Sequence, residues 1–122
     1  MGKIDFAEEF KKRTKKFAID VIQLFRKMPK TEEARIVGRQ ILKPATSIAS
    51  NYRAACRARS DKEFYAKLSI VVEEADETVS KMEIISESGI YKVEDNLSKE
   101  ANEILFMVAR SRKTLRNKIN EL

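Results

Sequence analysis

The sequence has no histidine, no tryptophan and one cysteine, Cys56, among 122 residues. Without histidine, a Ser-His or Cys-His catalytic pair cannot form, and the commonest general base near neutral pH is missing. A single thiol cannot make an internal disulfide and is compatible with a reducing compartment, so we expect a cytoplasmic protein. Metal sites built from cysteine and histidine are excluded as well. These absences predict a protein that is not an enzyme and holds no metal and no cofactor.

Glycine and proline are also scarce, with three and two copies. No apolar run approaches the ~20 residues that are needed to span a bilayer, and residues 1–5 lack the apolar segment of a secretion signal. We therefore expect neither membrane insertion nor export. A chain of this length supports one domain with its own hydrophobic core.

The few helix breakers divide the chain into four segments with helical periodicity. In the first segment, five apolar residues and Thr14 recur at alternating spacings of four and three residues, the pattern of a helix with one buried face: Phe10, Thr14, Phe17, Val21, Leu24 and Met28. Pro29 ends that segment, and Ser60 with Glu63 fits a capping box at the start of the third. The predicted helices span about residues 4–28, 31–58, 60–88 and 94–120. Because the connections are short, the sequence predicts an all-α fold, an antiparallel up-down four-helix bundle, with residues 1–122 as one domain.

The net charge of +6 is unevenly distributed. No acidic residue occurs between Glu33 and Asp61, whereas residues 60–89 hold eight acids and three basic residues. At 100° per residue, the basic side chains of the second predicted helix fall within about 80° of one another, opposite its apolar stripe. We call this set the basic ridge: Arg35, Arg39, Lys43, Arg53 and Arg57.

A basic ridge is typical of either a solvated helix face or a track for phosphate groups. The first predicted helix carries a second group of cations that would reinforce a phosphate track: Lys11, Lys12, Arg13, Lys15 and Lys16. The aromatic residues Phe10, Phe17, Tyr52 and Phe64 fall on the core stripes rather than among these cations, so base stacking is poorly supported. If nucleic acid binds, we expect contacts with its backbone rather than base readout.

Several apolar residues lie off the core stripes of three helices, which is more than we expect for a monomer. We predict an intersubunit surface from Ile19, Ile22, Ile70, Ile84 and Phe106. Glu73 and Glu77 of the third helix would add an acidic band that faces the basic ridge of a neighbouring subunit. Ser47 and Asn51 give the second helix a flank of small and polar residues, and a hairpin that turns near Ser60 would place them near Glu73 or Glu74 and near Ser69, respectively.

The order of motifs resembles one protein family over roughly four-fifths of the chain. The motifs are Met28-Pro29-Lys30, Gly38-Arg39-Gln40-Ile41-Leu42, Ser47-Ile48-Ala49-Ser50-Asn51, Ser60-Asp61-Lys62-Glu63-Phe64 and Glu73-Glu74-Ala75-Asp76-Glu77. They resemble the four-helix-bundle proteins related to those encoded in intervening sequences of bacterial 23S ribosomal RNA genes. The resemblance implies an antiparallel bundle that assembles as a ring-like homopentamer with a basic surface and a role with nucleic acid. A related branch looks like the accessory protein of diversity-generating retroelements, which works with a reverse transcriptase.

Two functions therefore remain open from the sequence. The first is a non-enzymatic, basic homo-oligomer that binds RNA or DNA through backbone phosphates. The second is a scaffold or accessory subunit that docks an acidic protein partner such as a reverse transcriptase.

Overall fold

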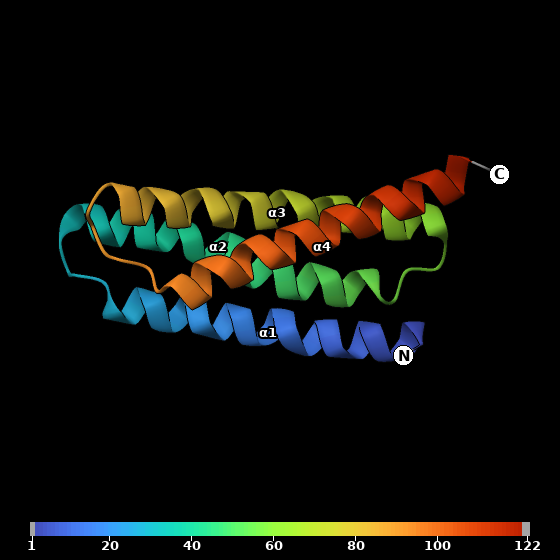
Figure 1. Ribbon diagram of the computed structural model, residues 1–122, viewed down its shortest axis with the longest axis horizontal. Helices are drawn as coiled ribbons and strands as arrows, with labels where there is room; N and C mark the ends of the chain where they lie inside the picture. Colours follow the sequence, from blue (N-terminus) through green and yellow to red (C-terminus); the bar gives the residue numbers. More distant parts are fainter. Residues whose placement is uncertain (1, 121–122) are drawn as a thin grey trace.

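The computed structural model describes residues 2–120, which form four α-helices. In chain order these are α1 (Lys3–Lys27), α2 (Glu32–Ala55), α3 (Asp61–Glu87) and α4 (Asp95–Asn120). Consecutive helices run antiparallel, and the start of α1 and the end of α4 lie at the same end of the bundle (Figure 1). The prediction of an all-α four-helix bundle is confirmed. Of the predicted domain, Met1, Glu121 and Leu122 lie outside the described residues.

Local capping fixes where the helices begin. The Thr31 hydroxyl accepts a hydrogen bond from the Ala34 amide at the start of α2, and the Ser60 hydroxyl accepts one from the Glu63 amide at the start of α3. The second half of the predicted capping box is replaced by an ion pair, because the Glu63 carboxylate contacts Arg59 at 3.5 Å. After α3, Gly89 has a φ of 81°, the left-handed conformation that ends many helices.

α2 ends at Ala55, three residues before the predicted end at residue 58. The Arg57 and Ala58 amides donate to carbonyls three residues back, on Ala54 and Ala55, so the chain tightens into a turn here. Pro44 lies within α2, and the helix continues through it.

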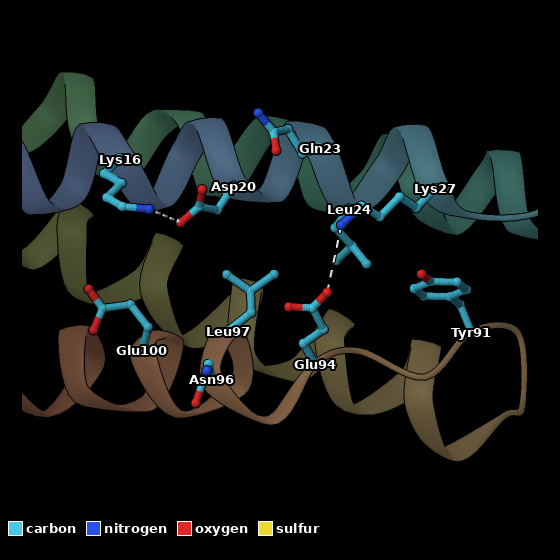
Figure 2. Close-up of a pocket in the computed structure, with 10 residues that line it drawn as sticks. All are labelled: Lys16, Asp20, Gln23, Leu24, Lys27, Tyr91, Glu94, Asn96, Leu97 and Glu100. Atoms are coloured by element: carbon cyan, nitrogen blue, oxygen red, sulfur yellow. Dashed lines mark hydrogen bonds and ion pairs between the residues drawn. The ribbon is translucent and has the colours of Figure 1, made fainter.

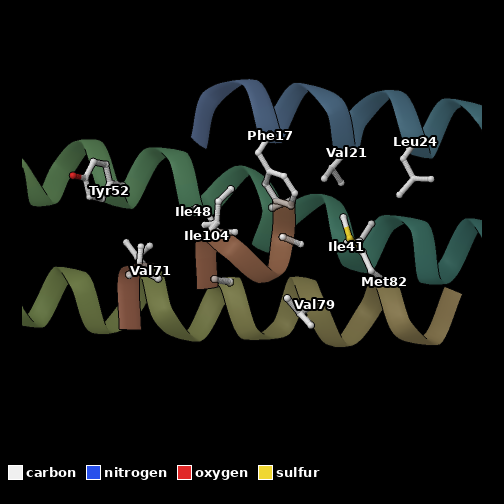
Figure 3. Packing of buried hydrophobic residues seen from close by; sticks show 14 of the residues in the cluster. Phe17, Val21, Leu24, Ile41, Ile48, Tyr52, Val71, Val79, Met82 and Ile104 are labelled. Atoms are coloured by element: carbon white, nitrogen blue, oxygen red, sulfur yellow. The ribbon is translucent and has the colours of Figure 1, made fainter. Parts of the chain in front are cut away.

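The predicted apolar stripes meet in one core along the bundle axis (Figure 3). Phe17, Ile41 and Ile104 are almost completely inaccessible to solvent. Two threonines share this core, and each satisfies its hydroxyl within its own helix, since Thr14 donates to the Lys11 carbonyl and Thr78 to the Glu74 carbonyl. The bundle therefore buries its polar groups without unpaired donors at these positions.

α4 crosses the other helices obliquely (Figure 1). It begins beside α1 and ends beside the start of α3, where Lys118 contacts Asp61 at 3.4 Å. α1 and α4 consequently share the sparsest contact of any neighbouring pair of helices. In the described part of the chain, no helix combines the length and apolarity needed to cross a membrane.

Candidate nucleic-acid interface

All five side chains of the basic ridge are exposed. Arg35, Arg39, Lys43 and Arg53 lie on the side of α2 that faces away from its buried residues, and Arg57 lies in the turn that follows the helix. Among the described residues, none of the five forms an ion pair. No acid occurs in α2 after Glu33. The ridge is thus a row of cations whose charge the chain itself does not neutralise.

The ridge consists of two clusters. Arg35, Arg39 and Lys43 follow one another every four residues, a rise of about 6 Å per step, and Arg53 begins the second cluster about 15 Å beyond Lys43. The helix between them carries the exposed hydroxyls of Thr46 and Ser50. Both hydroxyls donate to α2 carbonyls, so their protons are already used inside the helix.

The structure separates the cations of α1 that the sequence had grouped together. Glu8 and Lys11 lie on the flank of α1 nearest the end of α2, and Arg53 is close enough to contribute to the low pKa of the Glu8 carboxylate. The main cause of that low pKa is the hydrogen bond from Lys11. Lys15 lies one turn after Lys11 on the same flank and is exposed. Lys11 and Lys15 can therefore extend the ridge.

Lys12 and Lys16 lie on the opposite flank of α1, beside α4. Together with Arg13 and Met107 they line a shallow hollow there. The prediction that all the α1 lysines share one surface with the basic ridge does not fit this arrangement. Helical geometry explains the difference, since consecutive residues point about 100° apart and a run of cations surrounds the helix.

Acidic residues one turn away also reduce the free charge of α1. Lys11 contacts Glu8 at 2.7 Å, Lys12 contacts Glu9 at 3.9 Å and Lys16 contacts Asp20 at 3.0 Å. Sequence reasoning could have found these pairs, because spacings of three and four residues place side chains together on a helix. The basic ridge of α2 is therefore the better-supported part of the predicted phosphate track.

Arg13 connects α1 to α4 instead of joining the lysines. Its Nε and Nη2 donate to the two carboxylate oxygens of Glu100 at 2.8 and 2.7 Å, and Nη2 also donates to Glu103 at 2.7 Å. Nη1 lies 3.1 Å from the Met107 sulfur. The hydrogen bond with Glu100 raises the pKa of the Arg13 guanidinium, and the Glu103 carboxylate adds to this effect. Arg13 is thus a structural clamp between two helices.

A hollow of about 290 Å³ lies between α1 and the start of α4 (Figure 2). Two of its lysines are paired with acids, Lys16 with Asp20 and Lys27 with Glu94 at 3.6 Å. The Glu100 carboxylate on its wall is held by Arg13. Because its charged groups largely satisfy one another, this hollow does not extend the cationic surface.

Of the four aromatic residues predicted on core stripes, Phe10, Phe17 and Tyr52 are buried and Phe64 is half-buried against the core. Tyr52 packs edge-on against Phe10 with 4.8 Å between ring centroids. Burial raises the pKa of the Tyr52 phenol well above its usual value. Partial desolvation also raises the pKa of the neighbouring Cys56 thiol at the end of α2, although its hydrogen bond with Tyr52 acts in the opposite direction.

The apolar residues assigned to an intersubunit surface are mostly exposed. Ile19, Ile70, Ile84 and Phe106 have 46%, 38%, 45% and 65% of their surface accessible, whereas Ile22 is half-buried. The sequence assignment omitted two further residues of this kind, Phe6 at 41% and Ile36 at 48%. Ile36 could have been found, since it lies off the core stripe of α2, whereas Phe6 continues the core stripe of α1 one turn before Phe10, on which its ring stacks.

The polar residues that the sequence assigned to the flank of the second helix, Ser47 and Asn51, form hydrogen bonds with each other. Asn51 donates from Nδ2 to the Ser47 carbonyl at 2.9 Å and to the Ser47 hydroxyl at 2.8 Å, so both half-buried side chains are satisfied within α2. The Ser69 hydroxyl likewise donates to its own helix, at Tyr65. The hydrogen bonds of Ser47 and Asn51 within the described residues thus stay inside α2, and their expected nearness to α3 stays a prediction.

Glu73 and Glu77 are exposed on α3 and form no ion pair within the described residues. Across residues 2–120, no three His, Cys, Asp or Glu side chains are grouped so that they could hold a metal ion. These carboxylates thus present an acidic face of α3 on the bundle surface.

The fold and this surface define a class of protein, the small four-helix bundles with a cationic helix face. A family model described as "23S rRNA-intervening sequence protein" matches residues 8–110, and the chain belongs to that family. Among solved structures, the chain is similar to a protein of unknown function from the S23 ribosomal protein family of Bacteroides thetaiotaomicron. The two share 25% identity with a TM-score of 0.74, over 84% of this chain and 97% of the other. The comparison with curated proteins found no match.

Proposed function

We propose that this protein is a non-enzymatic homo-oligomer, a pentamer as the family resemblance implies, that binds nucleic acid through backbone phosphates. The observation that carries the proposal is the basic ridge, five exposed cations without an acidic partner in the described chain. Cations arranged in this way attract phosphates without regard to sequence, since they displace the counterions that surround a nucleic acid. The family description names 23S rRNA, which makes structured RNA the first ligand to test.

Assembly would strengthen this interaction. A pentamer carries five times the +6 charge of the chain, a total of +30, and presents five ridges to one polyanion. Several weak contacts on one ligand raise the overall affinity through the high effective concentration of each further contact.

Filter binding to structured RNA and to duplex DNA over a salt series tests the proposal. The ridge variant replaces Arg39, Lys43, Arg53 and Arg57 with alanine. Each lost phosphate contact lowers the slope of log affinity against log salt by about 0.7–0.9, so four contacts lower it by about 3 in each subunit that touches the ligand. The matched control removes four exposed lysines outside the ridge: Lys12, Lys16, Lys99 and Lys113.

The proposal predicts that the ridge variant loses binding and that the control retains most of it. Equal losses in both variants would show that only the net charge matters. An absence of binding by the unmodified protein at physiological salt would overturn the nucleic-acid part of the proposal.

A second candidate function is the docking of an acidic protein such as a reverse transcriptase on the same face. Ile36 favours it, because this exposed apolar residue lies between Arg35 and Arg39 in sequence and could add apolar contact to a protein interface. Ile36→Ser separates the candidates. It weakens a protein complex, whereas phosphate binding and its salt slope stay unchanged.

A further inference from the structure

A large apolar groove opens at the end of the bundle where α4 diverges from α1. Its volume is about 970 Å³, and the side chains that line it include Phe6, Phe64, Leu68, Phe106 and Leu115. Phe6 and Phe106, one from each diverging helix, are 41% and 65% exposed. We call this the end groove. Soluble proteins rarely leave aromatic side chains exposed beside an apolar hollow unless another surface covers them.

The cations on the walls of the end groove outnumber its acids. Arg59, Arg110 and Lys118 line it together with the single acid Asp61. Asp61 is paired with Lys118 at 3.4 Å, and Arg59 contacts Glu63 nearby. Arg110 has no ion pair within residues 2–120. A complementary surface would therefore be apolar and acidic.

The outer face of α3 has this character. Ile70, Glu73, Glu77 and Ile84 are all exposed, and at 100° per residue they fall within about 60° of one another. We call these four residues the outer α3 stripe. It has apolar side chains at both ends and, between them, two carboxylates that no described cation neutralises. Nothing within the bundle covers it.

The lengths of the two surfaces also agree. From Ile70 to Ile84 the stripe spans about 21 Å of helix at 1.5 Å per residue. The part of α4 that lines the end groove, from Phe106 to Lys118, spans about 18 Å by the same measure. One helix could therefore lie along the groove over most of the stripe.

We propose that the outer α3 stripe of one copy of this chain occupies the end groove of the next copy. Ile70 then contacts the exposed rings of Phe6 and Phe106, which both lie beside Met107. Glu73 and Glu77 approach Arg110 one turn further along α4, and Ile84 lies at the Lys118 end of the groove. The contact joins two different surfaces of the same chain, so every copy offers one of each, and such head-to-tail contacts close into a ring when the rotation between copies allows it. This inference rests on the homo-oligomer of the proposed function and specifies its interface.

Two interface variants and a control test the contact by light scattering. The groove variant is Phe106→Ser with Arg110→Ala, and the stripe variant is Ile70→Ser with Glu77→Arg. All four side chains are exposed, so neither variant removes part of the core. The control, Glu32→Arg with Gln40→Ser, reverses one charge and shortens one side chain at exposed sites outside every predicted or proposed interface. Circular dichroism checks that each variant is folded.

We expect the unmodified protein and the control to assemble and each interface variant to be monomeric. Mixed in equal amounts, the two interface variants should form a species of two chains, because one keeps an intact groove and the other an intact stripe. Interface variants that still assemble like the unmodified protein would overturn this contact, as would a mixture that stays monomeric. If the unmodified protein is itself monomeric, both this contact and the homo-oligomer of the proposed function are overturned. The nucleic-acid part of the proposed function is tested independently by filter binding.

Discussion

Replacing Arg13 with alanine removes the clamp that joins α1 to α4. The change deletes the two-pronged contact with Glu100, the contact with Glu103 and the contact with the Met107 sulfur. It also leaves two carboxylates three residues apart on α4, and these repel each other on the same helix face. Because α1 and α4 contact each other sparsely, few other interactions compensate for this loss.

The size of the effect follows from the geometry and the exposure of the pair. A charge-assisted hydrogen bond contributes about 1.5–3 kcal/mol to stability when it is sheltered. The Arg13 and Glu100 side chains remain 32% and 28% exposed, so screening by solvent lowers the expected loss to about 1–2 kcal/mol. Arg13→Lys should recover only part of it, since an ammonium group cannot make the two-pronged contact.

Urea denaturation of Arg13→Ala, Glu100→Ala and the double variant measures the pair directly through a double-mutant cycle. We expect a coupling energy of about 1 kcal/mol between Arg13 and Glu100. The same cycle on Lys16 and Asp20, an exposed pair within α1, should give about 0.3–0.5 kcal/mol. A coupling energy for Arg13 and Glu100 no larger than that of the control pair would refute the clamp.

Three further changes test other parts of the structure. Gly38→Ala places a Cβ 2.5 Å from the Phe25 ring, and this clash should lower the free energy of unfolding by about 1–3 kcal/mol in urea denaturation. The loss should outweigh the gain of about 1 kcal/mol in helix propensity. In a Phe25→Ala background the clash is absent, so Gly38→Ala should stabilise the protein there. Ile104→Ala in the core should cost about 2–5 kcal/mol, whereas Ile19→Ala at the surface should change stability by less than about 0.5 kcal/mol. Because the pKa of Cys56 is raised, iodoacetamide should alkylate the folded protein at pH 8 more slowly than the urea-unfolded chain, and equal rates would contradict that shift.

The basic ridge was the part of the candidate site most accessible to sequence reasoning. The helical spacing of its cations, opposite the apolar stripe, explains why they are exposed. The absence of acids between Glu33 and Asp61 explains why their charge is not neutralised. The lysines of α1 were harder to assign. Whether Lys11 or Lys16 shares a surface with the ridge depends on which flank of α1 packs against α2, and residue spacing within α1 does not contain that information.

The sequence by itself determined the four helices, the stripes that form their core and the cationic face of α2, because each depends on periodicity and capping within a single helix. Only the tertiary structure decided how those helices meet. The oblique path of α4 assigned Arg13 to Glu100 and opened the end groove between Phe6 and Phe106, residues 100 positions apart in the chain. Such contacts depend on crossing angles and on the packing of several helices at once, which no single helical stripe specifies.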